Sequence, residues 1–323
     1  MSSGVVRRGV RDGKIRYRCN VCGIWFFVNR TKPLSSFDLL EQYLSGMPLR
    51  KISAYHGISL GTVFNKTHKA LRELPHCADI TRELCTKFSG ILLVDGKFIK
   101  VIGYEKKIPV LYGIDYQTHD IPTYKLVPSE NYLACLEFFK SLRLLNYPLQ
   151  ALVCDDNPNI REACLAVYPK AVIQICQNHF KENIRRMLGV RTDPSYQAFM
   201  HEIEILFSCK RSLDDFNRVG KNIFNKYKED SLCVKVMLDI DFRKDVLLGY
   251  LKFPNTPRTT NLIESYNSHM EARLKSIKGF KSFETADLWV NGYIIKRRNQ
   301  KFTDCKGKFK HLNGTTSLEK SRK

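Results

Sequence analysis

The chain has 323 residues, which is long enough for one sizeable folded domain together with one or two small modules. Hydrophobic residues make up 43% of the sequence and aromatic residues 11%, and this composition excludes a chain that is disordered throughout. The formal net charge of +21, from 53 Lys and Arg against 32 Asp and Glu, favours a polyanionic partner, most often nucleic acid.

The 11 cysteines are scattered along the chain and odd in number, so they predict no disulfide framework. No segment reaches the roughly 18 consecutive apolar residues that a membrane span requires, and the first residues do not resemble a signal peptide. We therefore expect a cytoplasmic protein, in a reducing compartment, that does not associate with a membrane.

The first predicted segment, residues 1–33, is basic and carries Cys19 and Cys22 at a turn followed by aromatic residues. One half of a zinc ribbon has this form, because a structural zinc site takes four ligands and commonly uses two such cysteine pairs. No second pair lies upstream, and no later Cys or His pair has a familiar zinc spacing. The segment is therefore interpreted as a partial zinc-ribbon-like element, with zinc binding by Cys19 and Cys22 left open.

Residues 34–76 show a helical pattern of apolar residues that is interrupted at Gly57, where Ser59 is suited to cap the next helix. Two helices joined by such a turn form a helix-turn-helix, in which the start of the second helix enters the major groove of DNA. The side chains expected to contact DNA are then Thr62, Asn65 and Lys66. An ordinary helical hairpin used only for packing is the alternative.

Residues 88–323 are predicted to form the third and largest unit, in which short apolar runs alternate with helices. Five strands are expected, at residues 90–103, 109–117, 121–129, 149–154 and 171–176. Three consecutive strands followed by alternating helices and strands predict a mixed sheet with helices on its faces. Residues from about 190 to 252 have only a helical pattern, which predicts an all-helical insertion, and the polar tail from Lys306 is expected to be frayed.

Carboxylates occur where such a sheet would present them. Asp95 follows an apolar run and lies either in mid-strand or at an Asp-Gly hairpin. Asp155 and Asp156 directly follow a predicted strand, where the alternative role is to cap the next helix. Glu264 lies in a predicted helix after the insertion. Two Asp and a Glu on one sheet can bridge two divalent cations, and their oxygen ligands favour Mg²⁺ or Mn²⁺ over Zn²⁺.

Four segments then carry a resemblance to a known family: VDGKF (94–98), GIDYQTHDIPTYKLVPSEN (113–131), VCDDNPNIREACLAVYPKAVIQICQNHFKENIRR (153–186) and RTTNLIESYNSHMEARLKSIKGFKSFETA (258–286). In these segments the chain resembles the Mutator-like superfamily of DDE transposases, which includes bacterial insertion-sequence enzymes. The resemblance implies an α/β RNase-H-like fold with a helical insertion and the catalytic residues Asp95, Asp155 and Glu264, with Asp156 as the alternative second position. It also implies a Cys-x-x-His signature, matched by Cys176 and His179, for which a structural role beside the site is expected.

The function implied is that of a prokaryotic, nucleoid-associated transposase that binds double-stranded DNA as a homodimer or larger oligomer. It would bind terminal inverted repeats, cleave DNA with two Mg²⁺ or Mn²⁺ ions and join the freed 3′ end to a target. Two alternatives are a DNA-binding regulator derived from a transposase, which would not cut, and a structure-specific nuclease, which would not join. The basic residues Lys296, Arg297 and Arg298 are expected to grip the DNA backbone, unless they belong to a solvated tail.

Overall fold

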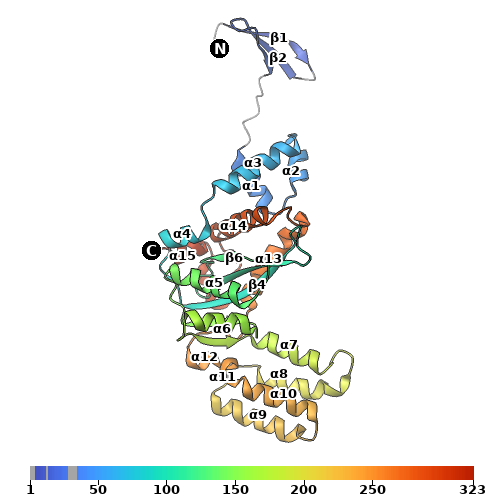
Figure 1. Ribbon diagram of the computed structural model, residues 1–323, viewed down its shortest axis with the longest axis vertical. Helices are drawn as coiled ribbons and strands as arrows, with labels where there is room; N and C mark the ends of the chain where they lie inside the picture. The colour runs from blue at the N-terminus through green and yellow to red at the C-terminus, as the bar shows by residue number, and fades with distance from the viewer. Residues whose placement is uncertain (1–3, 12–13, 28–34) are drawn as a thin grey trace.

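The computed structural model describes residues 4–11, 14–27 and 35–323 and shows a mixed α/β protein (Figure 1). The N-terminal strands form a separate antiparallel sheet in the order β1-β2-β3, with bounds β1 (Val5–Arg11), β2 (Lys14–Cys19) and β3 (Trp25–Phe27). The remaining residues of the predicted zinc-ribbon-like segment, 1–3, 12–13 and 28–33, lie outside the described residues. Within the described residues, none of the helices combines the length and the apolar character needed to cross a bilayer.

Helices follow the small sheet, namely α1 (Ser36–Leu44), α2 (Leu49–His56), α3 (Leu60–Glu73) and α4 (Cys77–Leu84). The turn between α2 and α3 is made by Gly57, whose left-handed φ of 62° suits a residue without a Cβ. Ser59 then caps α3, because its hydroxyl accepts a hydrogen bond of 3.1 Å from the backbone N–H of Thr62. The glycine turn and the serine cap are at the positions predicted from the sequence.

The main sheet has five strands in the order β6-β5-β4-β7-β8. Their bounds are β4 (Ile91–Ile99), β5 (Ile108–Asp115), β6 (Tyr124–Leu126), β7 (Ala151–Cys154) and β8 (Val172–Ile175). The pairs β4–β5 and β5–β6 are antiparallel, whereas β4–β7 and β7–β8 are parallel. The mixed sheet predicted from the sequence is therefore confirmed.

Helices cover both faces of this sheet (Figure 1). Side chains of β4 alternate between the two faces: Leu92 and Val94 pack with α5 (Tyr132–Leu144) and α6 (Pro158–Val167). Ile91 and Leu93 belong to the opposite core, which contains α13 (Asn261–Ile277) and α14 (Phe283–Asn299).

Helices α1 and α3 belong to that same second core, because their buried leucines pack against α14. Gly292 of α14 lies at this contact, where an added Cβ would come within 2.6 Å of Leu71 and 3.4 Å of Leu44. Two ion pairs at the rim join Arg72 to Glu284 at 3.2 Å and Lys296 to Glu41 at 2.6 Å. The N-terminal helices thus pack directly on the C-terminal part of the chain.

The helices between the last strand and α13 form a third core of their own at one end of the molecule (Figure 1). They are α7 (Gln177–Met187), η1 (Pro194–Tyr196), α8 (Gln197–Leu206), α9 (Leu213–Tyr227), α10 (Ser231–Phe242), α11 (Lys244–Leu247) and α12 (Gly249–Lys252). Helices α11 and α12 attach this unit to the sheet, since Gln174 of β8 donates to the Leu247 carbonyl at 2.9 Å and accepts from the Tyr250 N–H at 3.0 Å.

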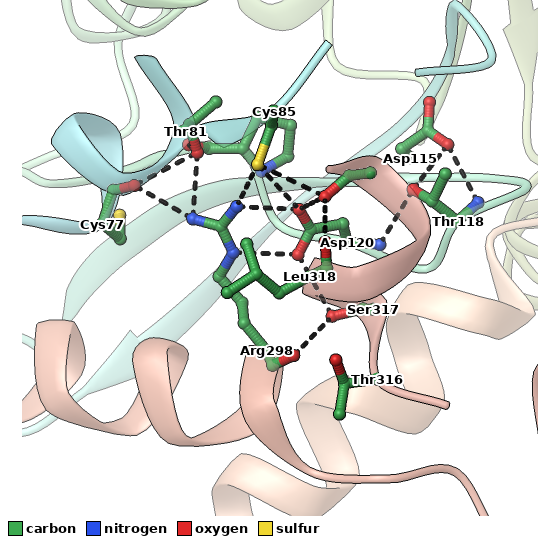
Figure 2. A network of polar contacts seen from close by, with 12 residues as sticks. Cys77, Thr81, Cys85, Asp115, Thr118, Asp120, Arg298, Thr316, Ser317 and Leu318 are labelled. Atoms are coloured by element: carbon green, nitrogen blue, oxygen red, sulfur yellow. Dashed lines mark hydrogen bonds and ion pairs between the residues drawn. The ribbon is translucent and has the colours of Figure 1, made fainter. Parts of the chain in front are cut away.

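The C-terminal tail is ordered and docked, so the prediction that it is frayed from Lys306 is wrong. It forms η2 (Gly307–Leu312) and α15 (Ser317–Ser321), and Ser317 and Ser321 are buried. Both serine hydroxyls donate to the buried carboxylate of Asp120, at 3.1 and 2.6 Å (Figure 2). The sequence could not show this attachment, because the partner of the tail lies in the loop between β5 and β6.

Arg298 completes the same network, and the prediction that it binds DNA is wrong. Its side chain is only 1% exposed, and its guanidinium donates two hydrogen bonds to Asp120, at 2.9 and 2.8 Å. It also donates to the Cys77 carbonyl and to the Thr81 hydroxyl, at 3.0 and 2.9 Å (Figure 2). A guanidinium held in this way joins α4, α14 and the β5–β6 loop and is not accessible to a phosphate.

We predict that Arg298→Met lowers the free energy of unfolding by about 3–5 kcal/mol, because it leaves Asp120 as a buried charge without its cation. Lys301→Met, an exposed side chain of the same segment, should change it by less than about 0.5 kcal/mol. Urea denaturation of the two variants measures both effects. The double variant Asp120→Asn with Arg298→Met should recover part of the loss, and a loss below about 1 kcal/mol for Arg298→Met would contradict the buried ion pair.

Candidate active site

Asp95 lies in the middle of β4, paired with Tyr112 of β5, which excludes the hairpin alternative for the Asp-Gly pair. Its side chain follows the alternation of the strand to the α13 face, where Asn267 donates from Nδ2 to its Oδ2 at 2.6 Å. The Gly96 N–H donates to the other oxygen at 2.8 Å, and Tyr112 donates from its hydroxyl to Oδ1 of Asn267 at 2.7 Å. Each oxygen of Asp95 is therefore oriented by a fixed donor.

Asp155 follows β7, the parallel neighbour of β4, and its Oδ1 lies 2.6 Å from Nδ1 of His179. Asp156 has different partners, since it forms ion pairs with Arg161 at 3.0 Å and with Arg243 at 2.8 Å. The helix-capping alternative for the two aspartates is also excluded, because Asn157 caps α6. Asp155 thus lies beside His179, whereas Asp156 joins α6 to the helical insertion.

Glu264 lies in the first turn of α13, the helix that covers the same face of the sheet to which the Asp95 side chain points. The Thr260 hydroxyl donates to its Oε1 at 2.8 Å, and Nδ1 of His179 is 3.8 Å from that oxygen. His179 therefore stands between the carboxylates of Asp155 and Glu264. Asp155 and Glu264, although far from Asp95 in the sequence, lie close enough to its carboxylate for their charges to raise its pKa.

Cys176 and His179 lie at the start of α7, directly after β8. The ligand atoms of Asp155, Cys176 and His179 are all within 4.8 Å of one another, and no other such group of Cys, His, Asp or Glu occurs among the described residues. The Cys176 sulfur accepts a hydrogen bond of 3.3 Å from the N–H of Thr260 and lies 3.0 Å from its hydroxyl oxygen. The sequence showed the Cys-x-x-His spacing but not its proximity to Asp155.

Negative charge dominates the electrostatics of the site. Burial and the nearby charge of Asp155 raise the pKa of Asp95 to about 6. Burial, together with the charges of Asp95 and Asp155, likewise raises the pKa of Glu130 to about 7. The contact with the Asp155 carboxylate raises the pKa of His179. Sequence reasoning missed Glu130, Thr260 and Asn267, since polar residues of these types are common outside functional sites.

The residues present fit a divalent cation. Oδ1 of Asp155 is buried and lies 2.6 Å from Nδ1 of His179. Asp95, Asp155 and Glu264 bring like charges together, and the charges of Asp155 and Glu264 both raise the pKa of Asp95. Carboxylate oxygens are the preferred ligands of Mg²⁺ and Mn²⁺, and a cation would relieve this repulsion.

The cysteine pair whose zinc binding the sequence leaves open lies in the N-terminal sheet, where Cys19 ends β2 and Cys22 follows in the turn. Among the described residues no third ligand joins this pair. On α3, Thr62 and Asn65 are exposed and Lys66 is partly exposed, so the surface expected to contact DNA is accessible.

Lys296 and Arg297 differ from the buried Arg298 because their side chains line a surface cavity. Lys296 is paired with Glu41, and the Arg297 guanidinium lies 4.6 Å from the centre of the Tyr266 ring. Both line a cavity of about 140 Å³ between α1, α13 and α14, together with the basic residues His269, Arg273 and Lys301. Contact of this basic cavity with DNA remains a prediction.

Comparison with known proteins adds one finding. A family model described as "Transposase, Mutator family" matches residues 29–297, which include every carboxylate described above. A comparison with curated proteins gave no match.

We predict a pH-dependent effect of Asp95→Asn in metal-free buffer. Wild-type Asp95 has a folded pKa of about 6, above its ordinary value of 3.8, so its ionisation destabilises the folded state as the pH rises through 6. The variant lacks this group and should gain on the order of 1–3 kcal/mol over the wild type between pH 4 and pH 7.5. Urea denaturation with EDTA at both pH values measures the difference.

Asp245→Asn is the matched control, because the Asp245 side chain is 85% exposed. The difference in the free energy of unfolding between Asp245→Asn and the wild type should change little with pH. If the difference in the free energy of unfolding between Asp95→Asn and the wild type is the same at both pH values, the pKa of Asp95 is not raised in the folded state.

Proposed function

Because the chain belongs to the Mutator family of transposases, we propose that it cleaves transposon ends and joins them to target DNA with Asp95, Asp155 and Glu264 as metal-binding catalytic residues. The observation that carries this proposal is the proximity of the three carboxylates, because the charges of Asp155 and Glu264 raise the pKa of Asp95. Such a cluster suits a pair of Mg²⁺ or Mn²⁺ ions that act on a phosphodiester.

The sheet supports an RNase-H-like fold for residues 88–323. Three antiparallel strands are followed by two parallel ones, in the order β6-β5-β4-β7-β8. The first and fourth of these strands in the chain, β4 and β7, are neighbours, which places Asp95 beside Asp155. The helical elements η1 and α8–α12 occupy the position of the all-helical insertion expected at about residues 190–252, before Glu264.

In the proposed mechanism the protein positions the reacting groups and supplies charge, while bound divalent cations would activate the attacking oxygen and stabilise the leaving one. Asp95 is held ready by Asn267 and by the Gly96 N–H. Glu264 is oriented by Thr260. In strand transfer the nucleophile is the 3′-OH of the DNA itself, so no protein nucleophile is needed.

Cys176 and His179 are proposed to support the site without taking a metal themselves. The Cys176 sulfur already accepts a hydrogen bond from the N–H of Thr260, the residue whose hydroxyl orients Glu264. Burial would raise the pKa of the Cys176 thiol, but hydrogen bonds with His179 and Thr260 outweigh it and lower that pKa. A chain of contacts through Cys176, Thr260 and His179 thus links β8 and α7 to Asp155 and Glu264.

We also propose that α3 reads DNA, as the second helix of a helix-turn-helix in residues 34–76. The exposed Thr62 and Asn65 on its first two turns support this, as does the basic charge of the chain. The cluster of the carboxylates of Asp95, Asp155 and Glu264 favours an enzyme over a regulator that only binds DNA. A regulator would bind equally well in EDTA and would never nick its site.

We predict that Asp95→Asn, Asp155→Asn and Glu264→Gln each slow cleavage by a factor on the order of a thousand, because several kcal/mol of transition-state stabilisation depend on metal binding. Binding to the terminal repeat should remain nearly unchanged. Cleavage of a labelled repeat end, beside a gel-shift measurement of binding, tests both statements. Asp95→Asn cleaving at the wild-type rate would overturn the assignment.

Asp156→Asn is the matched control for Asp155→Asn. Asp156 is held by Arg161 and Arg243, so its variant should keep cleavage within roughly tenfold of the wild type while losing stability. An inactive Asp156→Asn beside an active Asp155→Asn would reverse the two roles.

A second prediction concerns sequence recognition by α3. Replacing Asn65 and Lys66 by Ala should weaken binding to the terminal repeat by about 1–3 kcal/mol per lost base contact, and binding to random DNA by less. Competition binding with the two DNAs measures the ratio. Equal losses on both would mean that these side chains contact only phosphate.

A further inference from the structure

We propose that Glu130 contributes a fourth carboxylate to the cation site of Asp95, Asp155 and Glu264, so that the cations are held from both faces of the sheet. This inference rests on the proposed function, because it concerns the same metal ions. It assigns a metal-binding role to a residue that the three-carboxylate scheme leaves out.

The backbone of Glu130 is fixed close to the site. It precedes Asn131, which caps α5 by accepting a hydrogen bond of 2.9 Å from the Ala134 N–H. Asn159, at the start of α6, donates from Nδ2 to the Glu130 carbonyl at 3.3 Å. Since Asn159 follows Asp155 closely in the chain, this bond holds Glu130 next to the loop that carries Asp155.

Because Gly96 has no Cβ, there is space beside it for the Glu130 side chain. A Cβ at Gly96 would lie 3.1–3.3 Å from the carboxylate atoms of Glu130. The backbone gives no other reason for a glycine here, because Gly96 pairs regularly with Leu111 in β4 and has no left-handed φ. The space above Gly96 is therefore filled by a carboxylate.

Glu130 approaches from the face that the other acidic residues leave open. Along β4, Gly96 lies on the face of α5 and α6, whereas Asp95 lies on the α13 face. Glu264 comes from α13, and Asp155 directly follows β7. A cation at the ends of these strands would thus have carboxylates on both sides.

The Glu130 carboxylate has no hydrogen bond or ion pair with any described residue, although it is partly buried. By contrast, Glu137 on the adjoining helix pairs with Lys140 at 3.0 Å. Placing a carboxylate beside two others without a counter-ion is unfavourable. The negative charge of Glu130, the fourth carboxylate, is explained if the site binds divalent cations, which carry more positive charge than one side chain supplies.

The test uses the full-length protein and two readouts besides DNA cleavage. Mn²⁺ binding is measured by calorimetric titration, and thermal unfolding is measured in EDTA. For Glu130→Gln we expect the Kd for Mn²⁺ to rise about tenfold or more and the melting temperature in EDTA to rise, since a repulsive charge is gone. Glu137→Gln makes the same change outside the cluster and should leave the Kd unchanged.

Gly96→Ala displaces the Glu130 carboxylate without changing any charge, and it should weaken Mn²⁺ binding in the wild type but not in Glu130→Gln. If Glu130→Gln binds Mn²⁺ as tightly as Glu137→Gln while Asp95→Asn has lost binding, the role of Glu130 is overturned and the proposed function stands. If the wild type binds no Mn²⁺, the metal-dependent function falls and this inference falls with it.

Discussion

The buried ion pair between Arg298 and Asp120 determines where the C-terminal third of the chain sits, and the candidate site depends on that placement. Arg298 ends α14, and Asp120 lies in the loop that leaves β5. With α14 anchored there, the preceding helix α13 lies over β4 and presents Asn267 to Asp95. The network of Figure 2 therefore supports the alignment of Glu264 with the sheet, at a distance from the acidic cluster itself.

The sequence was sufficient for the sheet, the helical insertion and the glycine turn before α3, because these features depend on local apolar periodicity and turn chemistry. It favoured Asp155 over Asp156 by position in the resemblance alone, because the ion pairs of Asp156 with Arg161 and Arg243 exist only in the folded chain. The prediction for Arg298 was wrong because the sequence of a basic run does not show whether one of its residues forms an ion pair with a distant aspartate, here Asp120. Glu130 was missed for a similar reason: its proximity to Gly96 exists only in the folded chain.

The acidic cluster illustrates a compromise between stability and function. Asp95 and Glu130 have raised pKa values because burial and neighbouring carboxylates oppose their ionisation. A fold selected for stability alone would replace one of them with a neutral residue. The fixed donors around Asp95 show that its orientation is maintained despite this cost.

Gly292 has a consequence for exchanging parts between related proteins. It lets α1 and α3 approach α14 so closely that even a methyl group would strike Leu71. Helices α1 and α3 therefore pack tightly against α14, although a long stretch of chain separates them from it. A chimaera that borrows α1–α3 from a relative would have to borrow the matching face of α14 as well, so these helices cannot be exchanged as a single continuous segment.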